Sequence, residues 1–348
     1  MSNKKLKLSG NSAVKQNFII ILAAVALFAV FTLINPNFAS KGNVLNMVKA
    51  LAPYAILSLG VTFVIATGGI DLSIGTVLFG SAVLAGALCK TGVTQEEGTL
   101  WLTIPIILVV GVIFGLINGF LVAKCKIAPF IATLGSMLFS RGLTAVIAEA
   151  LRGTSSAIKY PSTGWFQKLF TNFNGFPIGL VWVLVLTIIC MVVMYKTRIG
   201  RYILAIGSNE EAARLSGINT DKYKIIAYVI CGTFASLAAL FYVAANPSLN
   251  LAAGNGMELD AVAGVYIGGT STTGGSATVI GTILGAMILV IIRQGLNLAM
   301  AGGVGVSATN VTYAVTGIIV VGAVMLDVMK KNNANKVKIE KPAEPAKK

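Results

Sequence analysis

This sequence of 348 residues contains little charge and little reactive chemistry. It has no histidine, 12 acidic residues and 11% charged residues overall, whereas about 25% is usual in a soluble domain. The shortage of charge excludes a water-soluble fold. Without histidine, and with four cysteines at no metal-binding or redox spacing, the chain is not expected to hold a metal ion or to carry out thiol chemistry.

Sequence motifs of common enzymes are missing as well. The chain has no G-x-x-x-x-G-K-[ST] phosphate-binding loop, no H-E-x-x-H zinc motif and no G-x-S-x-G nucleophile motif. These absences predict that the chain does not hydrolyse ATP by itself and has neither catalytic residues nor a cofactor. We therefore do not expect an enzyme.

Long apolar runs dominate the remaining sequence, because 56% of the residues are hydrophobic. A run of about 20 apolar residues is long enough to cross a membrane as a helix, and continuous runs argue against a β-barrel, whose strands alternate. A tenth, shorter run at 261–269 is bounded by glycines, which is typical of a re-entrant or half-length helix. The nine long runs are residues 18–34, 50–67, 72–89, 100–123, 127–148, 178–195, 225–245, 277–298 and 311–329. The sequence thus predicts an all-α polytopic membrane protein with about ten transmembrane helices.

The basic residues predict the orientation of these helices. The chain has a net charge of +15, but its lysines and arginines lie in the tails and in short connections, so we expect membrane topology and no nucleic acid partner. Short basic loops stay in the cytoplasm. With both termini inside, 19 basic residues fall on the cytoplasmic side and 6 on the other. Both termini are therefore expected to be cytoplasmic.

This orientation divides the chain into three parts. We expect a basic cytoplasmic tail at 1–17 and a transmembrane domain at 18–329. That domain contains a cytoplasmic loop at 196–224, and a lysine-rich cytoplasmic tail follows at 330–348.

Two glycine-rich segments interrupt apolar runs, at 68–75 and 268–275. Their matched glycines are consistent with an internal two-fold repeat, in which a substrate path runs between the halves. Asp71 lies in the first segment. It either caps a helix that begins at Leu72, by accepting backbone N–H bonds, or takes part in the substrate path.

Polar side chains inside apolar runs are candidates for that path. Charges within a membrane are costly and indicate function by default. Arg141 and Arg293 either face a wet cavity, pair with a carboxylate such as Glu149, Glu258 or Asp260, or extend to the membrane surface. The expected path residues are Asp71, Ser73, Asn118, Thr133, Ser136, Arg141 and Asn297.

Glycines spaced four apart predict close helix packing. Gly111, Gly115 and Gly119 fall on one face of a helix, as do Gly281 and Gly285. Small residues let helices approach each other in a membrane, where apolar side chains alone give no preference for protein over lipid. Packing is thus their expected role, although such faces also permit helices to slide.

The loop at 196–224 is expected to contain a short helix. Ser208 or Asn209 can cap its start, Glu210 and Glu211 complement the positive end of its dipole, and Gly217 can end it. Ala212, Ala213 and Leu215 then form a compact surface that fits a partner's groove. The alternative is a helix that lies on the membrane surface.

The segment from Glu211 to Gly217 has the form E-A-A-x-x-x-G, which resembles the coupling loop of ABC importer permeases. The chain from Asn43 to Asp327 resembles the ribose-type monosaccharide permeases of that superfamily. Four strings carry the resemblance, namely GVTFVIATGGIDLSIG, GLINGFLVAKCKIAPFIATLG, GRYILAIGSNEEAARLSGIN and ELDAVAGVYIGGTSTTGGSATVIG. Where such loops usually continue to a proline, this chain has Ile218-Asn219-Thr220-Asp221, which leaves the contact beyond Gly217 open.

The resemblance implies a permease subunit in a bacterial cell membrane that imports a small polar solute, most readily a monosaccharide such as ribose. It implies four kinds of partner: cytoplasmic ATP-binding subunits, an extracytoplasmic solute-binding protein, a second permease copy in a homodimer, and the small-molecule substrate. The coupling residues that it implies are Glu210, Glu211, Ala212, Ala213 and Gly217. A nucleoside or another small solute remains an alternative substrate. An ion-coupled secondary transporter is the alternative of another class, although such proteins use ionisable groups at mid-membrane that are scarce here.

Overall fold

The computed structural model describes residues 3–89, 97–152, 158–249 and 256–300, and parts of 310–329. The expected C-terminal tail at 330–348 and much of the last apolar run lie outside the described residues. The statements below concern the described part of the chain.

Helices make up almost all of the described structure. Seven are long and apolar enough to cross a membrane, and two shorter apolar helices accompany them, which confirms the all-α polytopic prediction. The long helices are α1 (Asn3–Ile34), α2 (Lys41–Ala66), α4 (Thr103–Ala123), α5 (Pro129–Arg152), α7 (Gly179–Lys196), α10 (Thr220–Ala245) and α12 (Val279–Met300). The two shorter apolar helices are α3 (Ile74–Leu88) and Asn310–Ile319, and the 11-residue helix α11 (Met257–Ile267) lies between α10 and α12 in the chain. The remaining elements are η1 (Pro36–Ala39), η2 (Glu97–Leu102), α6 (Trp165–Phe170), α8 (Arg198–Ser208), α9 (Glu210–Leu215), β1 (Ile158–Lys159) and β2 (Ser248–Leu249).

Three helix boundaries differ from or refine the sequence prediction. The run predicted at 72–89 forms the 15-residue helix α3, which begins at Ile74. The short tenth segment is the 11-residue helix α11. Helix α1 begins at Asn3, within the expected basic tail, rather than near residue 18. Lysine favours helix and no proline interrupts residues 3–17, so nothing local ends the helix there.

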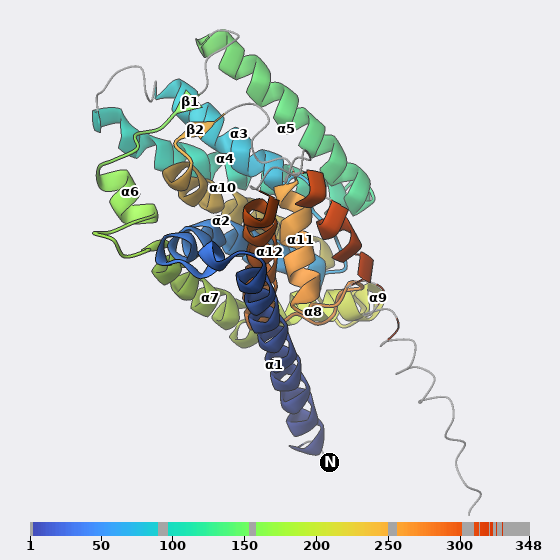
Figure 1. Cartoon of the computed structure of the whole chain (residues 1–348). Coiled ribbons are helices and arrows are strands. Elements are labelled where there is room, and N and C mark those ends of the chain that lie inside the picture. The colour runs from blue at the N-terminus through green and yellow to red at the C-terminus, as the bar shows by residue number, and fades with distance from the viewer. Residues whose placement is uncertain are drawn as a thin grey trace, which may run out of the picture.

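Helices α2 and α10 lie at the centre of the fold. Helix α10 packs between α4 and α2, while α12 packs against both α1 and α11, and α1 runs along α12 (Figure 1). The glycine face of α4 sits on α10. A Cβ atom added to Gly115 would lie 2.6 Å from the carbonyl oxygen of Tyr228, and one added to Gly119 would lie 2.8 Å from Ile225 Cα. The predicted packing role of these glycines is confirmed.

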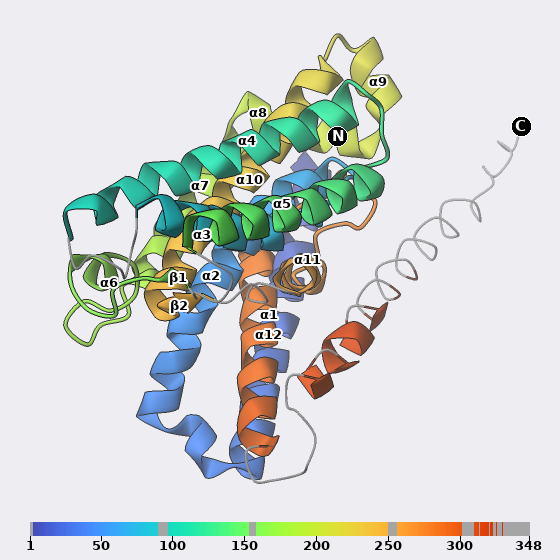
Figure 2. The same ribbon diagram turned by 90° about the horizontal axis from the view of Figure 1, so that it is seen from above.

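The small elements outside the long helices gather at two opposite ends of the molecule (Figure 2). At one end, β1 pairs with β2 in antiparallel register, Ile158 opposite Leu249, next to α6. Helices α8 and α9 lie at the other end. The two ends of the molecule therefore differ in the elements that they carry.

Candidate functional site

The short helix expected in the loop at 196–224 is α9. The side chain of Asn209 caps it by accepting a hydrogen bond from the backbone N–H of Ala212 at 2.9 Å. Gly217 follows the helix with a φ of +80°, a left-handed conformation that favours glycine. Both local predictions are confirmed, and of the two proposed caps it is Asn209 that serves, because Ser208 is the last residue of α8.

Ion pairs hold α9 against the start of α10. The Lys224 ammonium group lies 2.6 Å from a carboxylate oxygen of Glu210, and Arg214 lies 3.5 Å from the other oxygen. Arg214 also lies 3.6 Å from Glu211, whose side chain is largely exposed. Glu210 thus helps to hold α9 against α10 through its ion pair with Lys224, whereas Glu211 faces solvent.

The outward surface of α9 differs from the one predicted. Ala213 is buried against the protein, while Ala212 and Leu215 are exposed. The Leu215 side chain is 86% exposed, an unusual state for leucine in a helix of an aqueous loop. Helix α9 therefore presents one exposed large apolar side chain beside its charged residues.

Helix α8 lies directly on the two glycine-rich interruptions, which meet each other. The backbone N–H of Gly275 donates a hydrogen bond to the carbonyl oxygen of Ala66 at 3.0 Å. A Cβ atom on Gly207 of α8 would lie 2.5 Å from the Gly275 nitrogen, and one on Gly275 would lie 3.0 Å from Ser208 Cα. The end of α8 therefore touches the point where the two glycine-rich segments meet, here called the joined interruptions.

A chain of buried hydrogen bonds begins in the first interruption. The Asp71 carboxylate accepts from the backbone N–H of Ser73 at 2.9 Å and from its hydroxyl at 2.7 Å. The Asn118 amide donates to the same hydroxyl at 2.8 Å, and the Ser136 hydroxyl donates to the Asn118 carbonyl oxygen. These four side chains are buried, and that of Asp71 is 1% exposed. Four of the seven predicted path residues therefore form one polar chain across the α2–α3 interruption, α4 and α5.

Asp71 does not cap a helix at Leu72. The helix begins two residues later, at Ile74, with Ser73 at its N-cap position and no side-chain cap. The Asp71 side chain instead closes a local turn with Ser73 and joins it to the polar chain.

The other three predicted path residues lie outside this chain of hydrogen bonds. Thr133 is buried and bonds to the carbonyl oxygen of Pro129 in its own helix at 2.8 Å. Arg141 is exposed on α5, and Asn297 is exposed near the end of α12.

An internal ion pair joins α11 and α12. Arg293 pairs with the buried carboxylate of Asp260, and its guanidinium group lies 5.4 Å from the centre of the Tyr54 ring. Of the alternatives that the sequence left open for Arg293, pairing with Asp260 is the one observed. The sequence offered no sign of the Tyr54 contact, since Tyr54 comes from the distant helix α2.

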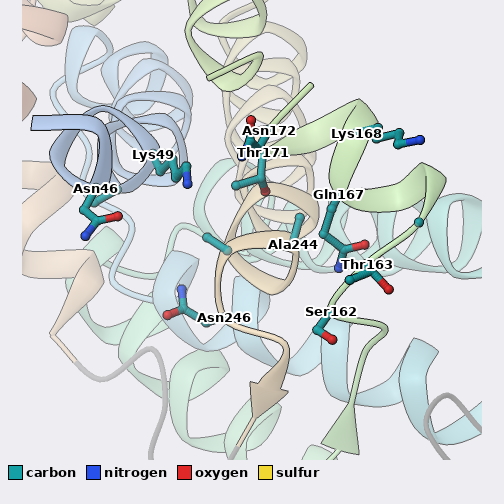
Figure 3. A pocket seen from close by; sticks show the side chains of 13 residues that line it. Asn46, Lys49, Ser162, Thr163, Gln167, Lys168, Thr171, Asn172, Ala244 and Asn246 are labelled. Atoms are coloured by element: carbon teal, nitrogen blue, oxygen red, sulfur yellow. The ribbon is translucent and has the colours of Figure 1, made fainter. Parts of the chain in front are cut away.

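Two surface hollows lie at the opposite ends of the molecule. The first, of 580 Å³, lies between the start of α2, the segment around α6 and the end of α10, and is lined by polar side chains such as Asn46, Lys49 and Gln167 (Figure 3). The second, of 460 Å³, lies between α9 and the connection from α4 to α5.

In the described residues, no group of three or more His, Cys, Asp or Glu side chains could hold a metal ion.

Comparison with known proteins gives the family. Residues 43–324 match the family described as "Branched-chain amino acid transport system / permease component". The chain is 38% identical over 312 residues to the ribose import permease protein RbsC of Escherichia coli (strain K12), covering 88% of this chain and 92% of that protein. It is 36% identical over 315 residues to RbsC of Bacillus subtilis (strain 168), covering 88% and 91%. It is also 32% identical over 334 residues to the fructose import permease protein FruF of Bifidobacterium longum (strain NCC 2705), covering 91% of each chain.

No solved structure matches the chain. The family match spans most of the sequence, and it agrees with the membrane helices that the fold presents. The chain belongs to the family of permease components of branched-chain amino acid and related transport systems, and it is a multi-pass membrane subunit of an ABC importer.

Proposed function

We propose that this protein is the membrane path of an ATP-driven importer for a monosaccharide, with ribose as the first candidate. The observation that carries the proposal is the similarity to ribose import permeases over 88% of the chain. An importer permease of this family works with ATP-binding and solute-binding partners. We further propose that two copies of this chain form the membrane part, with both termini of each copy in the cytoplasm.

Energy would enter through α9. Closure of the ATP-binding subunits would pull the two copies of α9 together, and α8 would pass the movement to the joined interruptions that it touches at Gly275. A ligand or partner shifts a conformational equilibrium only when its interactions differ between the two states. In this proposal the Asp71 to Ser136 polar chain is the part that changes, because its members lie on three separate elements.

The polar chain has a suitable depth for a path. Asn118 lies six residues before Lys124, so in the proposed orientation it sits about 9 Å inside the cytoplasmic end of α4, at 1.5 Å per residue. Hydroxyl and amide groups can exchange hydrogen bonds with the hydroxyl groups of a sugar as it passes. Weak contacts suit this task, since a tight site would hold the solute back.

The hollow in Figure 3 is our candidate surface for the solute-binding protein. It lies at the end of the molecule opposite α9, and its polar rim includes Asn46, Lys49 and Lys168. A polar surface fits a partner that must bind and leave during each cycle.

Transport in liposomes tests the proposal. The permease would be reconstituted with its ATP-binding subunits and a loaded solute-binding protein, and uptake of radiolabelled ribose, fructose and a nucleoside would be measured with and without ATP. We expect uptake of one monosaccharide that requires ATP and persists when ion gradients are collapsed. Uptake that proceeds without ATP and stops with the ion gradient would contradict the proposal, and ATP-dependent uptake of the nucleoside alone would change the substrate.

The coupling role of α9 has its own test. Replacing the exposed Glu211 by lysine reverses a charge at the start of the helix, so we expect the ATP-binding subunit to be lost on co-purification while the permease still inserts. Glu149→Lys makes the same change on exposed α5 and is expected to retain the subunit. Normal co-purification of the Glu211→Lys variant would count against this placement.

A further inference from the structure

We infer that the ATP-binding subunit touches a second element beside α9, namely the turn between α4 and α5 at residues 124–128, here called the basic turn. The E-A-A-x-x-x-G motif does not include this turn. The inference rests on the proposed function and adds a contact to it. The hollow of 460 Å³ between the basic turn and α9 is where the two elements would meet the partner.

The basic turn and α9 are fixed to the same few residues of α10. Lys126 and Lys124 lie 2.6 Å and 3.1 Å from the two carboxylate oxygens of Asp221, in the first turn of α10. Lys224, one turn further along, binds Glu210 of α9. A partner that pulls on α9 would therefore displace the basic turn with it, and one docking surface can include both.

The backbone of the basic turn supports a fixed surface. Lys126 has a φ of +55°, a left-handed conformation that lysine rarely adopts. Such a conformation persists only when surrounding contacts hold it, and the hydrogen bond from Lys126 to Asp221 is one such contact. The turn is thus positioned before a partner arrives.

The charge of the basic turn is only partly balanced. Two ammonium groups share the single carboxylate of Asp221, and the side chains of Lys124 and Lys126 remain 53% and 57% exposed. Between the turn and α9, the hollow is lined in part by the apolar residues Ile127 and Pro129. This arrangement fits a protein segment that places an apolar side chain in the hollow and an acidic side chain on the lysines.

The same hollow argues against a layer of anionic lipid headgroups as its occupant. Glu210 and Glu211 line it together with the basic residues, so a uniformly negative surface would be repelled on one side. A protein partner can place acids against the lysines and bases against the glutamates, which is the pattern of complementary charge at protein interfaces.

The native cysteines provide a direct test. Cys125 lies in the basic turn and is exposed, while Cys89, Cys190 and Cys231 are buried. A bulky maleimide applied to the folded permease therefore reports on Cys125. We expect labelling of Cys125 to become about tenfold slower when the ATP-binding subunit is present at a concentration that fills about nine tenths of its sites.

Two variants keep the test specific. With Glu211→Lys, which we expect to release the subunit, Cys125 is expected to label at the rate of the free permease. With the double replacement Lys124→Glu and Lys126→Glu, we expect the subunit to bind about tenfold more weakly, the loss of about one good charge contact. Lys159→Glu, the same type of replacement at one exposed site in β1 at the opposite end, is the control and is expected to leave binding unchanged.

The outcomes separate this inference from the proposed function. If the subunit co-purifies with the wild-type permease but Cys125 labels at the same rate with and without it, the basic turn is not a contact and the inference is wrong, while the proposed function stands. If no subunit binds the wild-type permease at all, the proposed function itself fails. Equal protection of Cys125 in anionic-lipid nanodiscs without the subunit would assign the turn to lipid and also overturn the inference.

Discussion

At the scale of single residues, the Arg293–Asp260 pair places opposite charges side by side between two membrane helices. Asp260 is 2% exposed, and the guanidinium group also contacts the face of Tyr54. The pair links α11 to α12, and Tyr54 adds α2 to the same contact. Its members were visible in the sequence as charges in apolar surroundings, but their partners depend on which helices are neighbours.

Removal of one member of this pair is predicted to destabilise the protein. Arg293→Met leaves a buried carboxylate without its counter-charge, which costs about 3–5 kcal/mol of unfolding free energy. We expect a clearly lowered melting temperature of the detergent-solubilised permease. The double variant Arg293→Met with Asp260→Leu removes both charges and is expected to recover much of the loss. A double variant less stable than Arg293→Met would contradict the predicted pairing energy.

Residue types in the polar chain were predictable, while their grouping was not. Asp71, Ser73, Asn118 and Ser136 stand out in the sequence because they are polar within apolar runs. Sequence spacing relates residues only within one helix, and these four come from three elements. For the same reason the sequence also predicted Arg141 and Asn297 as path residues, although both are exposed and lie outside the polar chain.

At the scale of elements, α8 connects α9 to the point where the two glycine-rich interruptions meet. Its Gly207 packs against the backbone of Ala66 and Gly275, with no room for a side chain. The sequence predicted the capped helix α9 from local signals at Asn209 and Gly217. It gave no signal for the docking of α8, since that contact is made by backbone atoms distant in the chain.

A side chain at Gly207 is predicted to reduce ATP-driven transport without preventing the ATP-binding subunit from binding. In Gly207→Val, the added atoms would push α8 off the joined interruptions, while α9 and its capping residue Asn209 stay unchanged. We expect the ATP-binding subunit to co-purify normally and ATP-driven uptake to fall clearly, because α8 would no longer pass the movement of α9 to the interruptions.

Gly42→Val is the matched control for this prediction. An added Cβ atom at Gly42 in α2 meets nothing within 4 Å, so the same substitution tests valine in a helix without a clash. We expect near-normal uptake from it. Equal loss of uptake in both variants would show that the effect of Gly207→Val does not come from the α8 contact.

At the scale of the whole molecule, the helical fold and its membrane setting follow from the apolar runs. Seven of the predicted runs correspond to the long helices, because a bilayer demands about 20 apolar residues from each full crossing. The lengths of α3 and α11 were harder to predict. The start of α3 and the end of α11 lie at the joined interruptions, and a tertiary contact of this kind cannot be predicted from hydropathy.

The direction of the whole chain in the membrane is a further prediction. The basic residues place both termini in the cytoplasm, together with α8 and α9. A protease site added to the C-terminus is expected to be cut in inside-out vesicles and protected in intact spheroplasts. A site inserted beside Lys168 in α6, in the expected external segment, is expected to show the reverse. The same result for both sites would contradict the predicted topology, which places the two sites on opposite sides of the membrane.

The hydrogen bond between Ala66 and Gly275 has a consequence for biosynthesis. Helices α2 and α3 leave the ribosome long before α11 and α12. During that time the turn between α2 and α3 lacks its contact with the segment between α11 and α12. The molecule can close around its centre only near the end of translation. Nascent chains that stop before α11 would therefore be natural substrates for membrane quality control.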